Sequence, residues 1–122
     1  MTLFYIALFG ILGAWARYGQ TILVQDIFGR SFPLATLSIN VIGSFLMGFL
    51  FTLTLEKLSI SGALRTGILT GGLGAYTTFS TFSIETYTLF QSGYLLKAAS
   101  YVILSFALGL LAVILGVWLA QR

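Results

Sequence analysis

Residues 71–83 read GGLGAYTTFSTFS, and this stretch decides how the rest of the chain is interpreted. Glycines at positions 71, 72 and 74 are followed by hydroxyl side chains at nearly every other position, with two phenylalanines three residues apart. The flanking sequence is strongly apolar. A helix that faces lipid has little use for hydroxyls, because hydrocarbon offers them no partners. We therefore interpret the stretch as the lining of a polar path through a bilayer.

The composition of the chain indicates an integral membrane protein. Of its 122 residues, 58% are hydrophobic and 7% are charged, and the mean hydropathy is +1.03, whereas soluble domains carry about 25% charged residues. Six basic and three acidic residues are too few for a nucleic-acid surface. The sequence contains no cysteine or histidine, and Asp26, Glu56 and Glu85 form no apparent acid–base pair, which argues against an enzyme.

Four apolar stretches are each about long enough to cross a hydrocarbon core. They predict an all-α fold, a single domain over residues 1–122 with transmembrane helices at about 3–24, 34–55, 63–90 and 95–120. Pro33 stands where the start of a helix tolerates proline. The first stretch is not interpreted as a signal peptide, because no Lys or Arg precedes it.

The glycine run predicts a break in the third helix. Glycine costs about 1 kcal/mol relative to alanine inside a helix, and three glycines fall within four positions here. Irregular backbone at membrane depth persists only where protein or a water-filled cavity satisfies it. A break also exposes carbonyl groups that can bind a cation. A flexible kink in a packed bundle is the alternative.

Phe79 and Phe82 share one face of the predicted helix, with Ser80, Thr81 and Ser83 beside them. Such a stripe is also typical of core packing or lipid contact. The functional alternative uses the positive edge of each ring, which can meet a small anion while hydroxyls donate hydrogen bonds.

Other polar residues fall inside the predicted spans. Asn40 lies in the second, where its amide either binds a ligand or joins helices. Arg17 and Glu85 are ionisable groups for which we expect structural or vestibular roles. Tyr101 and Ser105, one turn apart in the fourth span, would extend a track of hydroxyls.

The distribution of charge and of small residues points to assembly. Basic residues are almost balanced between the two sides, with Lys57, Arg65 and Arg122 opposite Arg30 and Lys97. This balance leaves two interpretations open, a weakly biased single orientation or dual topology. Small residues four apart predict helix-to-helix contacts, within or between subunits, at Gly10 and Ala14, Gly67 and Gly71, and Ala112 and Gly116.

Together these motifs resemble the CrcB/Fluc family of fluoride ion channels. The resemblance covers nearly the whole chain and is carried by Arg17, by Asn40-x-x-Gly43, and by residues 74–83 followed by Glu85. The chain departs from the family pattern at Ala75 and Tyr76, where the family often has glycine and leucine.

The resemblance implies an antiparallel, dual-topology homodimer with two fluoride pores along the subunit interface, in the inner membrane of a prokaryotic cell. Phe79 and Phe82 would flank fluoride beside Asn40, and a polar track would include Ser80, Thr81, Tyr101 and Ser105. The carbonyls of Gly74 and Thr77 from both subunits would hold a structural sodium ion, and Arg17 would lie near an aqueous entrance. The implied function is passive export of cytoplasmic fluoride, which reduces its toxicity.

Two alternatives come from other classes. Small dual-topology multidrug exporters have a similar length, but they resemble one another in a membrane-embedded glutamate of the first span, where this chain has Arg17 and no acid. A non-transporting assembly subunit that packs through its glycines would leave the Thr-Ser run unexplained.

Overall fold

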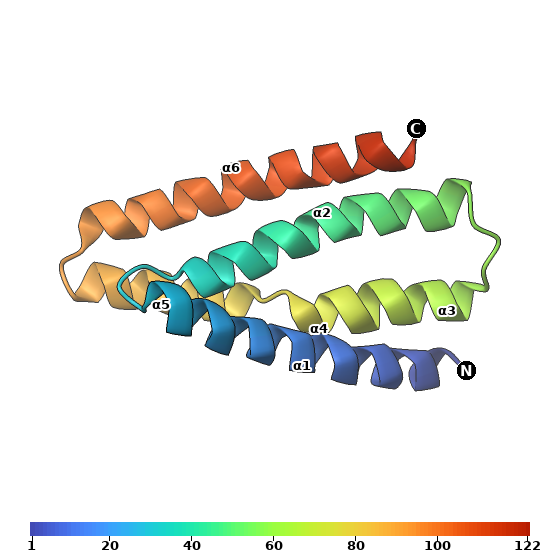
Figure 1. Ribbon diagram of the computed structural model, residues 1–122, viewed down its shortest axis with the longest axis horizontal. Helices are drawn as coiled ribbons and strands as arrows, with labels where there is room; N and C mark the ends of the chain where they lie inside the picture. Colours follow the sequence, from blue (N-terminus) through green and yellow to red (C-terminus); the bar gives the residue numbers. More distant parts are fainter.

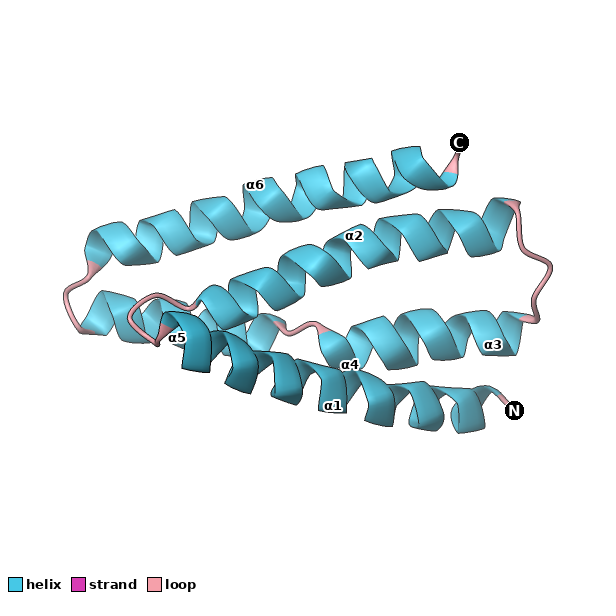
Figure 2. Ribbon diagram, in the orientation of Figure 1, coloured by secondary structure: helices cyan, strands magenta, loops and turns pink.

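The chain folds into four helical segments, and each segment is antiparallel to the one before it (Figure 1). The computed structural model describes residues 1–122, and its regular structure is entirely helical (Figure 2). Three segments are single helices, α1 (Thr2–Phe28), α2 (Leu34–Glu56) and α6 (Leu95–Ala120). The third consists of α3 (Gly62–Thr66), the π-helix η1 (Gly67–Leu73), α4 (Gly74–Tyr76) and α5 (Phe79–Gln91). Both termini lie at the end of the bundle opposite the link between α1 and α2 (Figure 1).

The first helix continues beyond the apolar stretch that predicted it. Gln25 and Asp26 end the apolar run after Val24, but they remain helical, and α1 reaches Phe28. The helix ends at Gly29, whose φ of 80° lies in the left-handed region that glycine adopts without a steric penalty. The end of a helix is therefore set here by backbone conformation and not by polarity.

The third segment is interrupted, but not at the glycines. Gly74 has helical angles (φ −61°, ψ −40°), whereas Thr77 (φ −86°, ψ 162°) and Thr78 (φ −152°, ψ 121°) are extended. The predicted position of the break was thus wrong by a few residues. The glycines stay helical, and their lack of side chains lets this segment pack closely against α1.

The glycines of η1 allow close approach to α1. A Cβ atom on Gly71 would lie 2.6 Å from the carbonyl oxygen of Ile6, and one on Gly67 would overlap Tyr5. From the other side, a Cβ on Gly13 would overlap the carbonyl of Gly72. The predicted contact through Gly67 and Gly71 is confirmed, and it lies within one subunit.

A second glycine seam joins α2 to α6. A Cβ atom on Gly116 would lie 2.8 Å from the backbone nitrogen of Phe49, and one on Gly48 would overlap Val113. These two helices make the most extensive contact in the molecule. The helix-to-helix contact predicted at Gly116 is also confirmed within the subunit.

The outer surface of the bundle is apolar. Leu96 is 82% exposed and Trp15 is 71% exposed. Many other large apolar side chains along α1 and α6 are exposed as well. Two helices, α2 and α6, are long and apolar enough to cross a membrane. Membrane crossing by α1 and by the third segment stays a prediction.

Candidate functional site

The break in the third segment is held by the side chain of Asn40. Its Nδ2 donates to the carbonyl of Thr78 over 3.0 Å, and its Oδ1 accepts from the backbone N–H of Thr78 over 2.9 Å. The amide thus replaces the helical acceptor that the Thr78 N–H loses at the break, and it adds a donor to the Thr78 carbonyl, which as the N-cap carbonyl also begins α5. An asparagine amide has two N–H donors, so one N–H of Asn40 remains for another acceptor.

Thr78 also starts the helix that follows. Its Oγ1 accepts from the backbone N–H of Thr81 over 3.1 Å, the usual N-cap contact. The same hydroxyl donates to Thr81 Oγ1 over 3.1 Å and lies 3.4 Å from Ser80 Oγ. The predicted track residues Ser80 and Thr81 therefore gather around Thr78 at the start of α5.

These contacts change the bonding of two backbone carbonyls at the break. In a continuous helix the Gly74 carbonyl would accept from Thr78, and the Thr77 carbonyl from Thr81. Both N–H groups are instead donated to side chains, of Asn40 and Thr78 respectively. Carbonyl oxygens released in this way are suitable ligands for a hard cation. The chemistry of Gly74 and Thr77 therefore fits the predicted sodium site.

Phe79 and Phe82 lie side by side but in different surroundings. Their ring centroids are 5.7 Å apart with a tilt of 48°. Phe82 is 7% exposed and meets Tyr101 and Phe106 of α6 edge to face, at 5.0 and 6.1 Å. Phe79 is 71% exposed. The pair thus has one ring fixed in the subunit and one ring at its surface.

Behind Phe82 lies a buried polar contact between α5 and α6. Tyr101 is fully buried and donates its hydroxyl to Glu85 Oε1 over 2.8 Å. One turn further along α6, Ser105 Oγ is buried without a hydrogen-bond partner. An unpaired buried hydroxyl is costly, so Ser105 Oγ is a donor that still lacks an acceptor in the single subunit.

Two adjoining hollows collect most of the predicted pore residues. One has a volume of about 310 Å³ and is lined by Asn40, Thr77, Thr78 and Phe79 among others. The second, about 260 Å³, is lined by Asn40, Phe79, Phe82 and Ser105 among others. Asn40, Phe79 and Ser44 line both. Ser80, Thr81 and Tyr101 line neither hollow.

The break is tied to α1 by two polar side chains. Arg17 Nε donates to the carbonyl of Ala75 over 3.2 Å. Gln20 accepts a hydrogen bond from the hydroxyl of Tyr76 and donates to Ser38 Oγ over 3.0 Å. Arg17 is half-buried beside the break, and the residue at one of the two family departures, Tyr76, contributes to this link.

Sequence reasoning gave no site role to Thr78, Gln20 or Ser44. A threonine directly before a helix is a common N-cap, so Thr78 could have been identified once the break was placed correctly. Gln20 is a polar residue inside an apolar stretch, and this position could have marked it as a residue that makes buried hydrogen bonds. Nothing local marks Ser44, because its importance depends on α5 lying across from it.

This arrangement defines a class of protein, a small helical membrane protein with largely apolar hollows beside a helix break, each lined by a few polar side chains. The model of the family described as CrcB-like protein, Camphor Resistance (CrcB), matches residues 4–117. The chain belongs to this family.

Its curated relatives have consistent names. It is 62% identical over 117 residues to the fluoride-specific ion channel FluC of Acidithiobacillus ferrooxidans, covering 96% of this chain and 94% of the relative. It is 46% identical over 121 residues to the channel of that name from Roseiflexus sp., covering 99% and 98%. A relative from Methylococcus capsulatus is 51% identical over all of this chain, which spans 54% of that protein.

Proposed function

We propose that this protein is a fluoride-selective ion channel that passively exports cytoplasmic fluoride and so reduces its toxicity. The observation that carries the proposal is the hollow in which Asn40, Phe79, Phe82 and Ser105 meet. It combines an amide N–H, an unpaired hydroxyl and two aromatic rings without a formal positive charge. The names of the relatives at 62% and 46% identity agree with this chemistry.

Fluoride is small and strongly hydrated, so a pore must replace its water with several donors. Asn40 and Ser105 supply donors, while ring edges of Phe79 and Phe82 present weakly positive hydrogens. Weak, repeated contacts allow an ion to leave as well as to bind. Chloride is larger, and a narrow donor-lined path selects against it by size.

The working unit in this proposal is an antiparallel homodimer with a pore at each side of the subunit interface. Phe79 is 71% exposed in the single subunit and Ser80 is exposed as well, so a second copy is needed to enclose them. The near balance of basic residues between the two sides is compatible with insertion in both orientations.

A structural sodium ion belongs to the same proposal. The carbonyls of Gly74 and Thr77, whose helical donors are diverted to side chains, would hold it together with their counterparts in the second subunit. The ion would supply positive charge that satisfies these carbonyls where no lipid or water does.

The direction of transport follows from the membrane potential. In the inner membrane of a prokaryotic cell the potential is negative inside, and it drives an anion outward by about 2.3 kcal/mol per 100 mV. Glu85 and Arg17 then have supporting roles, Glu85 through Tyr101 and Arg17 through the carbonyl of Ala75.

Growth of bacteria that lack their own fluoride exporter tests the function. Expression of this protein should restore growth in fluoride and lower the fluoride content of the cells. Phe82→Ile, expressed to the same level in the membrane, is the matched control and should restore neither. Growth restored equally by both proteins would contradict a role for the aromatic pair.

Dual topology has a separate test. The sequence has no cysteine, so Ser59→Cys places a single thiol in the exposed link between α2 and α3. A membrane-impermeant maleimide should label about half of the molecules from each side of the membrane. Labelling from one side alone would exclude the antiparallel dimer and leave fluoride transport to be judged separately.

A further inference from the structure

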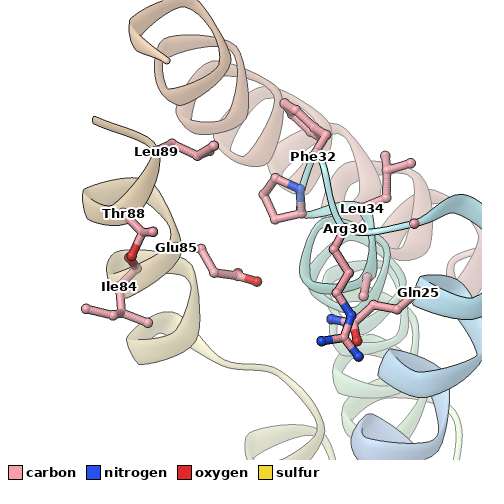
Figure 3. A pocket seen from close by; sticks show the side chains of 11 residues that line it. Gln25, Arg30, Phe32, Leu34, Ile84, Glu85, Thr88 and Leu89 are labelled. Carbon is pink, nitrogen blue, oxygen red and sulfur yellow. The ribbon is translucent and has the colours of Figure 1, made fainter. Parts of the chain in front are cut away.

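A third cavity opens at the end of the bundle where α1 passes into α2. Its volume is about 250 Å³. One wall is the link between these helices with their adjoining turns, and the other is the outer half of α5 (Figure 3). Arg30 extends from the link wall close to Gln25, and Glu85 points from α5 into the space between the walls (Figure 3).

Arg30 and Glu85 are the two charged residues that line this cavity. Arg30 is exposed, and its guanidinium makes no hydrogen bond or ion pair within the subunit, whereas Arg17, Arg65 and Lys97 all donate to backbone carbonyls. An arginine with five unused donors is free to meet an anion from solution.

The cavity is connected to the aromatic pair through side chains in contact. Glu85 accepts a hydrogen bond from Tyr101 over 2.8 Å. The Tyr101 ring lies 5.0 Å from that of Phe82, which lines the 260 Å³ hollow. The carboxylate therefore lies between the outer cavity and the hollow in which fluoride is proposed to bind.

An ionised carboxylate at this position poses an electrostatic problem for an anion path. It repels fluoride, and the repulsion is strong where walls of low dielectric constant focus the field. A cation in the same cavity removes much of this barrier. Arg30 is the residue that can do so.

We propose that Arg30 makes this cavity an anion-collecting mouth of the fluoride path. Its guanidinium offsets the charge of Glu85 and raises the local concentration of fluoride before the ion reaches Tyr101 and Phe82. The inference rests on the proposed channel function and adds one residue and one site to it.

The salt dependence of fluoride efflux tests the proposal. Purified Arg30→Gln in liposomes should pass fluoride about threefold more slowly than wild type at 10 mM ionic strength, where the Debye length is about 30 Å. The two rates should agree to within about 1.3-fold at 1 M, where the Debye length is about 3 Å. Sodium is held constant and an inert potassium salt sets the ionic strength. Arg30→Lys keeps the charge and should behave as wild type.

Lys57→Gln is the matched control. The side chain of Lys57 is exposed and makes no hydrogen bond. The residue directly follows α2, and this end of α2 lies at the opposite end of the subunit from the link between α1 and α2 (Figure 1). Its loss should leave the rate unchanged at both salt concentrations. Two results would contradict the proposed mouth without contradicting the channel function. One is an equal decrease in fluoride efflux in the two Gln variants, and the other is a low-salt efflux rate of Arg30→Gln equal to that of wild type. A wild-type protein that passes no fluoride would overturn both.

Discussion

The residues before Thr77 and those after Thr78 belong to one apolar stretch of sequence, yet they contact their surroundings in different ways. Before the break, η1 buries Gly67 and Gly71 against α1, where added Cβ atoms would meet backbone, and its buried leucines cluster with Ile39 of α2. After the break, Phe82 is the one buried residue of α5, and Phe79 is mostly exposed. The first half is fixed by packing. The second half leaves rings and hydroxyls available to a ligand and to a second subunit.

The largest expected effect comes from adding one methyl group to the packed half. In Gly71→Ala the new Cβ would lie 2.6 Å from the carbonyl oxygen of Ile6, and neither backbone can move easily. Overpacking of this kind costs about 1–3 kcal/mol or more. We expect most of the protein to be lost from the folded peak in size-exclusion chromatography.

Gly19→Ala is the control for this change. A Cβ on Gly19 would meet nothing within 4 Å in the subunit, so the variant should elute as wild type. Equal behaviour of the two alanine variants would contradict the packing role of η1.

The next effect tests the link between the two halves. Asn40→Asp keeps the shape of the side chain and the acceptor for the Thr78 N–H, but it replaces the donor to the Thr78 carbonyl by an oxygen. Losing one hydrogen bond costs about 0.5–1.5 kcal/mol. We expect a lower thermal midpoint and fluoride efflux below that of Phe82→Ile, because a negative charge would also repel fluoride. A wild-type midpoint would show that the amide does not hold the break.

Phe82→Ile tests the second half directly. It removes a ring that meets Phe79, Tyr101 and Phe106. Losing about 1.4 kcal/mol of ring-edge interaction corresponds to about a tenfold decrease in fluoride efflux. The dimer should still assemble. Wild-type efflux in this variant would remove the ring edges from the mechanism.

Phe79→Ile sharpens the comparison between the two rings. Because Phe79 is 71% exposed whereas Phe82 is 7% exposed, its replacement should slow fluoride efflux without lowering the thermal midpoint of the subunit. Phe82→Ile should lower both. Equal losses of stability in the two variants would contradict the division between a fixed ring and a surface ring.

The smallest effect separates two serines one turn apart in α5. Ser83 Oγ donates to the carbonyl of Phe79 over 2.9 Å, so its hydroxyl is already used and Ser83→Ala should leave efflux unchanged. Ser80 Oγ has only a 3.4 Å contact with Thr78. Ser80→Ala should therefore slow fluoride efflux about threefold, which corresponds to about 0.7 kcal/mol for the loss of one hydrogen bond to the ion. The reverse order of effects would place the hydroxyl track on the wrong face of α5.

The sequence predicted the helical segments, the glycine contacts and the proximity of Phe79 to Phe82, because each depends on local spacing or composition. It missed the position of the break. Glycine favours irregular backbone, but here it serves close packing, and the break is held by Asn40, which lies 38 positions from Thr78 in the sequence. No local pattern reveals that pairing.

The different exposure of the two rings could not be predicted either. It depends on Tyr101 and Phe106 of α6 lying against Phe82. The helical spacing gives the same face to both phenylalanines, and only the placement of the fourth segment distinguishes them. Arg30 lacked any motif, and its place across the cavity from Glu85 follows from the folding of the link between α1 and α2 (Figure 3).

Ion efflux from liposomes that hold the purified protein tests the central claim most directly, with a fluoride electrode and then a chloride electrode as detector. The account predicts fast fluoride efflux and negligible chloride efflux from the same vesicles. Well-folded protein that releases no fluoride, or releases chloride equally fast, would contradict it.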